Sequence, residues 1–259
     1  MSQYRQPTVF IGHGSPMYAL KPNRHTAAWA SLGKRLQKPD AILVISAHWL
    51  TRGTWLTAMP KPKTIHDFSG FPEALLDIQY PAPGSPALAY RVRDLMSQAV
   101  VLEEHEWGID HGAWSVLHYL YPRADVPVVQ LSLDGSLSAE EHYTLAKQLA
   151  PLRDENILIL GSGNIVHNLR LIEWDADAVP LPWAIEFNQF FTSQILAKQH
   201  PPVLEWQRAG HAARLSIPTP EHYWPALYPL ALQREDEQLE IITNGIEMGS
   251  ISMLSFLIH

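Results

Sequence analysis

The sequence predicts an α/β protein of one domain, in which helices cover a mostly parallel β-sheet. Short apolar runs alternate with longer segments of helical periodicity, an order typical of a sheet wrapped by helices. The 259 residues are 46% hydrophobic and 17% charged, which is enough to bury a sizeable core. No repeat, low-complexity stretch or composition break marks a second domain, so we expect one domain over residues 1–259.

Short apolar segments bounded by turn residues predict the strands of this sheet. Four of them are Thr8–Ile11, Ala41–Ile45, Val126–Leu133 and Asn156–Leu160. The second is continuously apolar, as expected of a strand that is buried on both faces of a parallel sheet. Two further strands are expected around a glycine-rich turn near the end of the chain, at 239–243 and 250–258.

Three segments with apolar residues at helical spacing predict helices. They are Ser85–Ala99, Ser138–Leu149 and Trp183–Gln199. The second opens with Ser138 and Glu141, the spacing of a capping box, and the third follows Pro182, a suitable first helical residue. The 21 prolines concentrate in connections, which predicts stiff loops rather than interdomain linkers.

Composition excludes several classes of protein. The 19 basic and 26 acidic residues give a net charge of −7, without the basic surface that binds nucleic acid or anionic membranes. The chain has no cysteine, which excludes disulfides, thiolate nucleophiles and cysteine-bound metals, so any metal has nitrogen and oxygen ligands. No apolar stretch approaches the ~20 residues that span a bilayer, and no signal peptide is visible. We therefore expect a cytoplasmic protein with no nucleic-acid or membrane partner.

Histidine is unusually frequent, at 13 residues, and two histidines follow predicted strands. His13 lies between glycines directly after the first strand, and His48 comes shortly after the second. Open α/β sheets bind ligands at the carboxyl ends of their strands. If these two strands are parallel neighbours, both imidazoles point into one crevice.

Three other histidines lie where a site could be built. The fourth strand runs into a glycine-rich turn that is expected to open a helix with His167 in an early turn. Thr219 and Pro220 predict an N-cap and a first helical residue, which places His222 where the helix dipole favours the neutral, metal-binding imidazole. Pro225 would kink or end this helix, so a short turn is the alternative. His111 lies in a glycine-bracketed loop before another helical pattern.

Each of these histidines also has a purely structural interpretation, as a cap or a hydrogen-bonded residue. His66, which Asp67 follows, is a further candidate that a loop turn would explain equally well. The others have no motif around them and are expected on the surface or in the core: His25, His105, His118, His142, His200, His211 and His259. The residues alone predict a divalent metal on imidazoles, and they leave open whether zinc activates water or iron reacts with oxygen.

Eight short motifs follow one another from about Thr8 to the C-terminus. They are 12–16 (GHGSP), 46–49 (SAHW), 66–72 (HDFSGFP), 80–84 (YPAPG), 110–112 (DHG), 163–168 (GNIVHN), 218–223 (PTPEHY) and 245–250 (GIEMGS). In this order and at this spacing the sequence resembles the bacterial 4,5-DOPA extradiol dioxygenase family, a branch of the class III (LigB-type) ring-cleaving dioxygenases.

The resemblance implies a LigB-like αβα sandwich, with one non-haem divalent metal per chain. It implies the following roles: His13, His48 and His222 as metal ligands, His167 as a ligand or substrate contact beside the metal, His111 as the acid/base, and Ser15 and Asn164 as substrate contacts. Distant class III relatives use two histidines and a glutamate. A histidine is in the third position here, but Glu221 is its neighbour, so which of the two ligates stays open. Fe²⁺ is expected for catalysis and Zn²⁺ in the purified protein.

The predicted function is extradiol cleavage of catechols such as L-DOPA by O₂, next to the hydroxyls rather than between them. His111 would take a proton from the catechol and return one later, and Asp110 is a candidate to orient its ring. The small aromatic substrate and O₂ are the expected partners, with the protein a monomer or small homo-oligomer. Two alternatives remain: a zinc-dependent hydrolase that uses the same histidines, and a non-enzymatic binding protein with the LigB fold.

Overall fold

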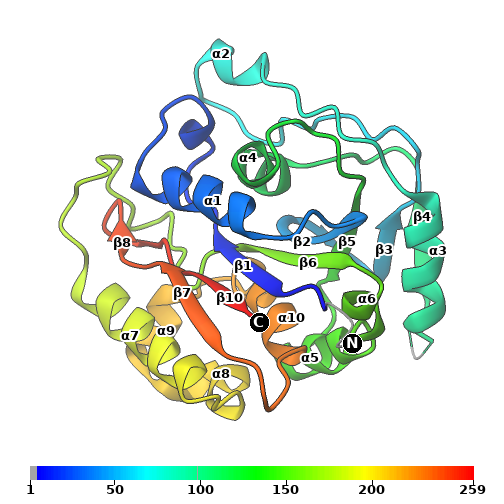
Figure 1. The fold of residues 1–259 in the computed structure, drawn as a ribbon. Helices are drawn as coiled ribbons and strands as arrows, with labels where there is room; N and C mark the ends of the chain where they lie inside the picture. The colour runs from blue at the N-terminus through cyan, green and yellow to red at the C-terminus, as the bar shows by residue number, and fades with distance from the viewer. Residues whose placement is uncertain (1–4, 98) are drawn as a thin grey trace.

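The computed structural model describes residues 5–97 and 99–259, and its centre is one eight-stranded sheet (Figure 1). The strands run in the order β4-β3-β5-β2-β6-β1-β10-β7. Their bounds are β1 Thr8–Gly12, β2 Ala41–Thr51, β3 Thr54–Thr57, β4 Val101–Glu104, β5 Val128–Asp134, β6 Ile157–Gly163, β7 Leu239–Thr243 and β10 Ser255–Ile258. A separate short hairpin consists of β8 Ile246–Glu247 and β9 Ile251–Ser252.

The four central strands are parallel, which confirms the predicted fold class. β5, β2, β6 and β1 pair in parallel, whereas β10 is antiparallel to both β1 and β7. The strands that lead to His13 and His48 are parallel but not neighbours, because β6 lies between them. All three strands nevertheless end at the same edge of the sheet, so the two histidines still meet there.

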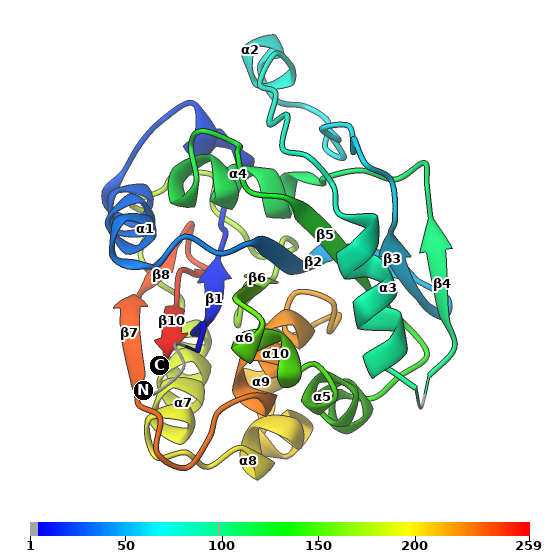
Figure 2. The same ribbon diagram turned by 45° about the vertical axis from the view of Figure 1, so that its right-hand side comes forward.

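Helices cover both faces of the sheet (Figures 1 and 2). The α-helices are α1 Arg24–Arg35, α2 Glu73–Leu76, α3 Pro86–Leu95, α4 His111–Leu120, α5 Ala139–Lys147, α6 Pro151–Asp154, α7 Pro182–Leu196, α8 Pro201–Leu204, α9 His211–Ser216 and α10 Leu227–Ala231. Three 3₁₀ helices are η1 Pro16–Ala19, η2 Trp206–Ala209 and η3 Trp224–Ala226. Helices α1 and α4 pack on one face, and α5, α7 and α10 on the other. Among the helices that the structure describes, none is long and apolar enough to cross a bilayer.

The burial of β2 explains why the two layers hold together. Leu43 and Ile45 join the core under α5 and α7, whereas Ile42 and Val44 join the core under α1 and α4. Alternate side chains of a strand point to opposite faces of the sheet. A continuous apolar run therefore packs against both helical layers, as predicted for this segment.

The helix boundaries follow local capping chemistry. Ser138 and Glu141 form the predicted capping box at the start of α5, and Pro182 is the first residue of α7, as expected. Helix α1 was not predicted, although Asn23 and Thr26 form a capping box at its start. The last predicted strand is divided into β9 and β10.

One predicted helix is wrong, and the one expected at Thr219 is only a short turn, the outcome expected if Pro225 ends it. The chain after β6 turns without forming a helix, and His167 forms an isolated bridge with Ile251 while its N–H donates to Ser216. At 219–223 there is only one turn, in which the N–H groups of Tyr223 and Trp224 both donate to the Pro220 carbonyl. In the first place a backbone N–H that could continue a helix donates to a distant part of the chain. In the second place the N–H groups donate within one tight turn.

His142 of α5 is a buried neutral histidine and predicts a pH-dependent stability. Its Nδ1 lies 3.0 Å from the Tyr228 hydroxyl, and its ring packs against Trp224 with centroids 4.5 Å apart. Burial lowers its pKa to about 4. Below pH 6.5 the unfolded chain therefore binds a proton that the folded chain does not, so stability falls as pH falls toward 4, by up to ~1.4 kcal/mol per pH unit.

Urea unfolding of the metal-free protein at pH 7, 6 and 5 measures this effect. The variant His142→Gln, which does not titrate in this range, is expected to lose less stability between pH 7 and 5 than the wild type. The exposed histidine His105 provides the control, because His105→Gln should keep the wild-type pH dependence. Equal pH dependence in wild type and His142→Gln would contradict the prediction.

Candidate metal centre

His13 lies where β1 ends in a tight turn. Its N–H donates to the Gly163 carbonyl at 3.0 Å, which continues the pairing of β1 with β6. Gly14 then has φ +63°, and a Cβ there would lie 2.5 Å from the Tyr18 ring. A glycine is therefore needed for the chain to turn away from the sheet immediately after His13. The His13 side chain is held at the edge of the sheet and buried.

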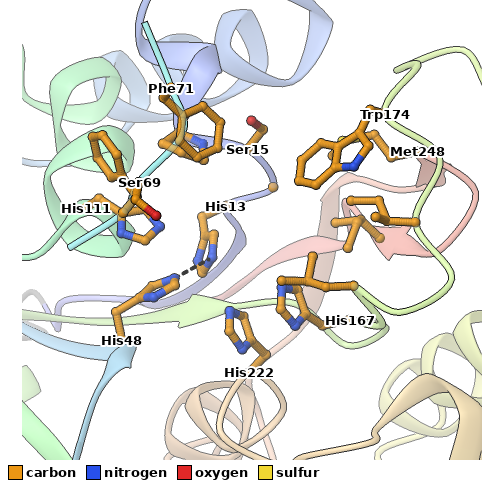
Figure 3. A pocket seen from close by; sticks show the side chains of 16 residues that line it. His13, Ser15, His48, Ser69, Phe71, His111, His167, Trp174, His222 and Met248 are labelled. Atoms are coloured by element: carbon orange, nitrogen blue, oxygen red, sulfur yellow. Dashed lines mark hydrogen bonds between the residues drawn. The ribbon is translucent and has the colours of Figure 1, made fainter. Parts of the chain in front are cut away.

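His48 lies within β2, which runs three residues beyond it. Pairing of β2 with β5 is irregular between Ile45 and Leu50 and then resumes at Leu50–Leu133. The strand therefore continues past its predicted end at residue 45. The irregularity is typical of a β-bulge, which re-aims side chains beside functional sites. His48 turns toward His13, and their Nε2 atoms lie 3.2 Å apart (Figure 3).

His222 approaches the same place across the end of β6. Its carbonyl accepts the N–H of Asn164 at 2.9 Å. A Cβ on Gly163 would lie 2.2 Å from the His222 carbonyl oxygen, so only glycine allows this approach. The ring of His167 stacks on that of His222, with centroids 3.5 Å apart and planes 7° from parallel (Figure 3).

The structure thus brings His13, His48 and His222 together at one point. Each offers one ring nitrogen, and these three atoms all lie within 4.8 Å of one another. Two further arrangements satisfy the same limit, His167 with Glu221 and His222, and His48 with Asp67 and His111. Residues from three distant parts of the chain therefore form one cluster at the carboxyl ends of β1, β2 and β6.

Hydrogen bonds fix the tautomers of two of these histidines. The Ser162 hydroxyl donates to the Gly112 carbonyl at 2.6 Å, so it accepts from Nδ1 of His13, 3.0 Å away. Nδ1 of His222 lies 3.1 Å from a Glu221 carboxylate oxygen, to which it donates. Both rings thus keep the Nε2 lone pair free, and Nε2 of His222 is buried without a hydrogen-bond partner among the described residues.

Burial keeps the cluster neutral. Desolvation lowers the pKa of His13, His48 and His222 well below the ordinary histidine value, and the neighbouring histidines lower it further. Burial likewise lowers the pKa of His167 to about 4. These imidazoles are therefore uncharged at neutral pH, which is the form that ligates metal.

This donor set fits a divalent metal ion. Nε2 of His13 and Nε2 of His48 are close enough to share either a proton or a cation, and Nε2 of His222 is buried with no hydrogen-bond partner among the described residues. A spacing of 3.2 Å suits two nitrogens that are each about 2.0–2.1 Å from one zinc-sized ion. Glu221 contacts Nδ1 of His222, the nitrogen remote from the cluster, and so supports the ring from behind.

His111 lies beside this cluster but outside the group of three nitrogens. It is the first residue of α4, and its ring centroid is 3.8 Å from that of His48. Its Nδ1 lies 2.9 Å from Oδ2 of Asp67, whose Oδ1 accepts the His111 N–H, also at 2.9 Å. Burial acts to raise the pKa of Asp67, but its contacts with His111 outweigh this and hold that pKa below its ordinary value.

Asp110 does not orient the His111 ring as the sequence suggested. Its Oδ1 accepts from the Ser46 hydroxyl and from the Ala113 N–H, and its Oδ2 accepts from the Gln130 amide. Asp110 therefore caps α4 and ties the helix to β2 and β5. The carboxylate at Nδ1 of His111 is that of Asp67, 43 positions before Asp110 in sequence number.

A cavity of about 290 Å³ opens directly over the histidines. Five histidines line one side of it: His13, His48, His111, His167 and His222. Apolar and aromatic residues form most of the rest: Phe68, Phe71, Leu169, Ile172, Trp174, Met248 and Ile251 (Figure 3). Among residues 5–97 and 99–259, no Lys, Arg, Asp or Glu lines this cavity. The arrangement suits a flat apolar ligand with polar atoms only on its histidine side.

Of the two predicted substrate contacts, one lines the cavity and the other does not. Ser15 lines the cavity, and its hydroxyl also accepts the Met17 N–H at the start of η1. The cavity lining does not include Asn164, which is fully buried. Its side chain donates to the Ser252 carbonyl and its N–H to His222, so it supports the segment that carries His222.

We did not predict a role at the site for Asp67, Ser162 or Trp174. Asp67 and Phe71 belong to one of the quoted motifs, which was a usable signal. Ser162 lies in the glycine-rich end of β6, where its partner, the Gly112 carbonyl, comes from a different part of the chain. Trp174 lies in a long connection after β6 that has no motif of its own.

Comparisons with known proteins agree with this arrangement. The sequence model of a family described as the catalytic LigB subunit of aromatic ring-opening dioxygenase matches residues 7–252. A protein of Escherichia coli (strain K12) named 4,5-DOPA dioxygenase extradiol is 51% identical over 260 residues, which cover 98% of this chain and 95% of that protein. A protein of the same name from Beta vulgaris is 36% identical over 255 residues, 96% of this chain and 95% of that one.

A solved structure is also closely similar. The crystal structure of an uncharacterized protein from Escherichia coli K12 matches with a TM-score of 0.87 and 45% sequence identity. The match covers 98% of this chain and 100% of the other. The central sheet and its helical layers are therefore shared across nearly the whole chain.

Proposed function

The chain belongs to the LigB family of aromatic ring-opening dioxygenases and is an oxidoreductase of that class, and from this premise we propose that it opens catechols such as L-DOPA with O₂. The reaction takes place at one non-haem divalent metal, in a catalytic domain that comprises residues 1–259. The observation that carries the proposal is the meeting of three neutral imidazole nitrogens, from His13, His48 and His222, at the base of an apolar cavity.

His13, His48 and His222 hold the metal in this proposal, and His167 lies against His222 as a further ligand or as a contact to the substrate oxygens. Nitrogen donors suit both iron(II) and zinc, so we expect zinc in the purified protein and iron(II) as the working metal. When bound, iron(II) supplies the electronic route for the reaction of dioxygen with a catechol.

The cavity walls position the ring, and His111 moves protons. Phe68, Phe71 and Trp174 bound a space for a planar aromatic ring, while Ser15 offers a hydroxyl at its side. His111 removes a proton from one catechol hydroxyl and later returns one to the opened product, a role suited to imidazole near neutral pH. Cleavage next to the two hydroxyls yields a product of the hydroxymuconic semialdehyde type.

Metal exchange tests the proposal directly. Metal-stripped protein is reconstituted with iron(II) or with zinc under anaerobic conditions, and oxygen uptake is followed after L-DOPA is added. We expect one O₂ consumed per L-DOPA and a yellow product with iron only. An iron-loaded protein that consumes no O₂ with any simple catechol would contradict the proposal, and ester or amide hydrolysis by the zinc form would favour a hydrolase.

A further inference from the structure

Asp67 contacts the predicted acid/base residue of the site, and we propose that it is a positioning residue that sets the tautomer of His111. It holds the proton on Nδ1 of His111, so that this ring presents its Nε2 lone pair to the cavity. The consequence for catalysis rests on the proposed function, whereas the tautomer itself does not.

The first step of the argument is how Asp67 is anchored. Its Oδ1 accepts the backbone N–H of His111 at the start of α4, 2.9 Å away. This leaves Oδ2 free to face side chains, 2.9 Å from Nδ1 of His111 and 3.6 Å from Nδ1 of His48. The Asp67 side chain is only 17% exposed, so few waters compete for that oxygen.

The second step is the chemistry of the two rings. An ionised carboxylate only accepts hydrogen bonds, so a histidine nitrogen in contact with it carries its proton. A neutral imidazole has one N–H, and a proton on Nδ1 leaves Nε2 as the basic nitrogen. The rings of His48 and His111 lie side by side, with centroids 3.8 Å apart, and both turn Nδ1 toward the same oxygen.

The third step is that the other nearby carboxylate, Asp110, is occupied. Both of its oxygens are committed to Ser46, Gln130 and the N–H of Ala113. His13 and His222, by comparison, have their own partners behind them in Ser162 and Glu221. Asp67 therefore faces Nδ1 of His111 as Ser162 and Glu221 face Nδ1 of His13 and His222.

The position of Asp67 also links this role to the cavity wall. It lies in the connection between β3 and α2, next to Phe68, whose ring stands edge-on to His111 with centroids 5.4 Å apart. His66 fastens the same connection, since its Nε2 lies 2.9 Å from the Ile78 carbonyl. The segment that supplies aromatic wall residues thus also fixes the proton of His111.

The test compares Asp67→Asn with Asp67→Glu. In Asp67→Asn the amide oxygen can still accept the His111 N–H, which turns the amide NH₂ toward Nδ1 of His111. A donor then faces that nitrogen, and we expect its proton to move to Nε2. Asp67→Glu keeps a carboxylate and should retain the Nδ1–H form. Asp77→Asn, on the exposed end of α2 in the same connection, is the matched control.

Two-dimensional ¹H–¹⁵N spectra of the histidine rings read the tautomers in metal-free protein at pH 8, with signals assigned from His111→Gln and His48→Gln. We expect Nδ1–H at His111 in the wild type, Asp67→Glu and Asp77→Asn, and Nε2–H at His111 in Asp67→Asn. In the iron-loaded enzyme, Asp67→Asn should lower kcat by about 10²–10⁴-fold with KM changed far less.

The outcomes separate this inference from the proposed function. Wild-type tautomers in Asp67→Asn, or Nε2–H already present at His111 in the wild type, would overturn the inference whatever the enzyme does. If the wild type opened no catechol, the proposed function would be wrong, but the spectra would still decide whether Asp67 sets the tautomer. The comparison holds even if both variants lower the melting temperature, because only one of them removes the acceptor.

Discussion

Replacing His111 with alanine is expected to lower kcat for catechol opening by about 10²–10⁴-fold while bound metal stays at the wild-type level. His111 lines the cavity, but its nitrogens are not among the three that converge from His13, His48 and His222. Its loss should therefore remove proton transfer and spare the metal. Oxygen uptake by iron-reconstituted protein measures the first effect, and elemental analysis of the same samples measures the second.

The control for this experiment comes from the same helix. His118 of α4 is half-buried and is not part of the cavity lining, so His118→Ala should keep both turnover and metal. If His111→Ala lost its metal along with its activity, His111 would be assigned to the metal site instead. Turnover at the wild-type rate would remove it from the mechanism altogether.

Replacing His13 with alanine is expected to abolish metal binding and, with it, all turnover. His13 supplies the central nitrogen of the group, 3.2 Å from Nε2 of His48, with its tautomer fixed by Ser162. Loss of a supporting partner behind a ligand already weakens metal binding by about 10–100-fold. Loss of the ligand itself should exceed that, and competition with a chelator measures zinc affinity directly.

A surface histidine provides the control for this experiment. His211, exposed at the start of α9, does not line the cavity, and His211→Ala should bind zinc as the wild type does. Zinc affinity of His13→Ala within threefold of the wild type would show that the metal is held elsewhere. Thermal unfolding of both variants without metal establishes that they are folded before the comparison is made.

The sequence predicted the strands better than their order. Apolar runs identified β1, β2 and β6, and β5 was recognisable because apolar residues alternate with Gln130 and Ser132 in a fully buried strand. The insertion of β6 between β1 and β2 depends on packing between segments that are far apart in the chain, which no local pattern encodes. The short strands β3 and β4 were not predicted, because four residues give too little periodicity.

The histidines of the site could be predicted from the sequence, but the residues that contact those histidines could not. His13 and His48 follow strands whose carboxyl ends meet, so their meeting could be expected from the fold class. The helix expected at His167 does not form, because its N–H bonds to the Ser216 carbonyl, and at Thr219 the chain forms only the short turn given as the alternative. The residue that contacts His111 is Asp67, whereas the sequence indicated its neighbour His66 as the candidate.

The place of β1 in the sheet has a consequence for how the protein matures. β1 is the first strand to leave the ribosome, yet both of its neighbours, β6 and β10, are synthesised much later. The strand that presents His13 therefore waits unpaired through most of translation, and His222 emerges later still than β6. Such long-range closure is slow and leaves apolar strands exposed in the nascent chain. The three histidines of the metal centre can then meet only after residue 222 has been synthesised, so metal capture comes late in the making of the chain.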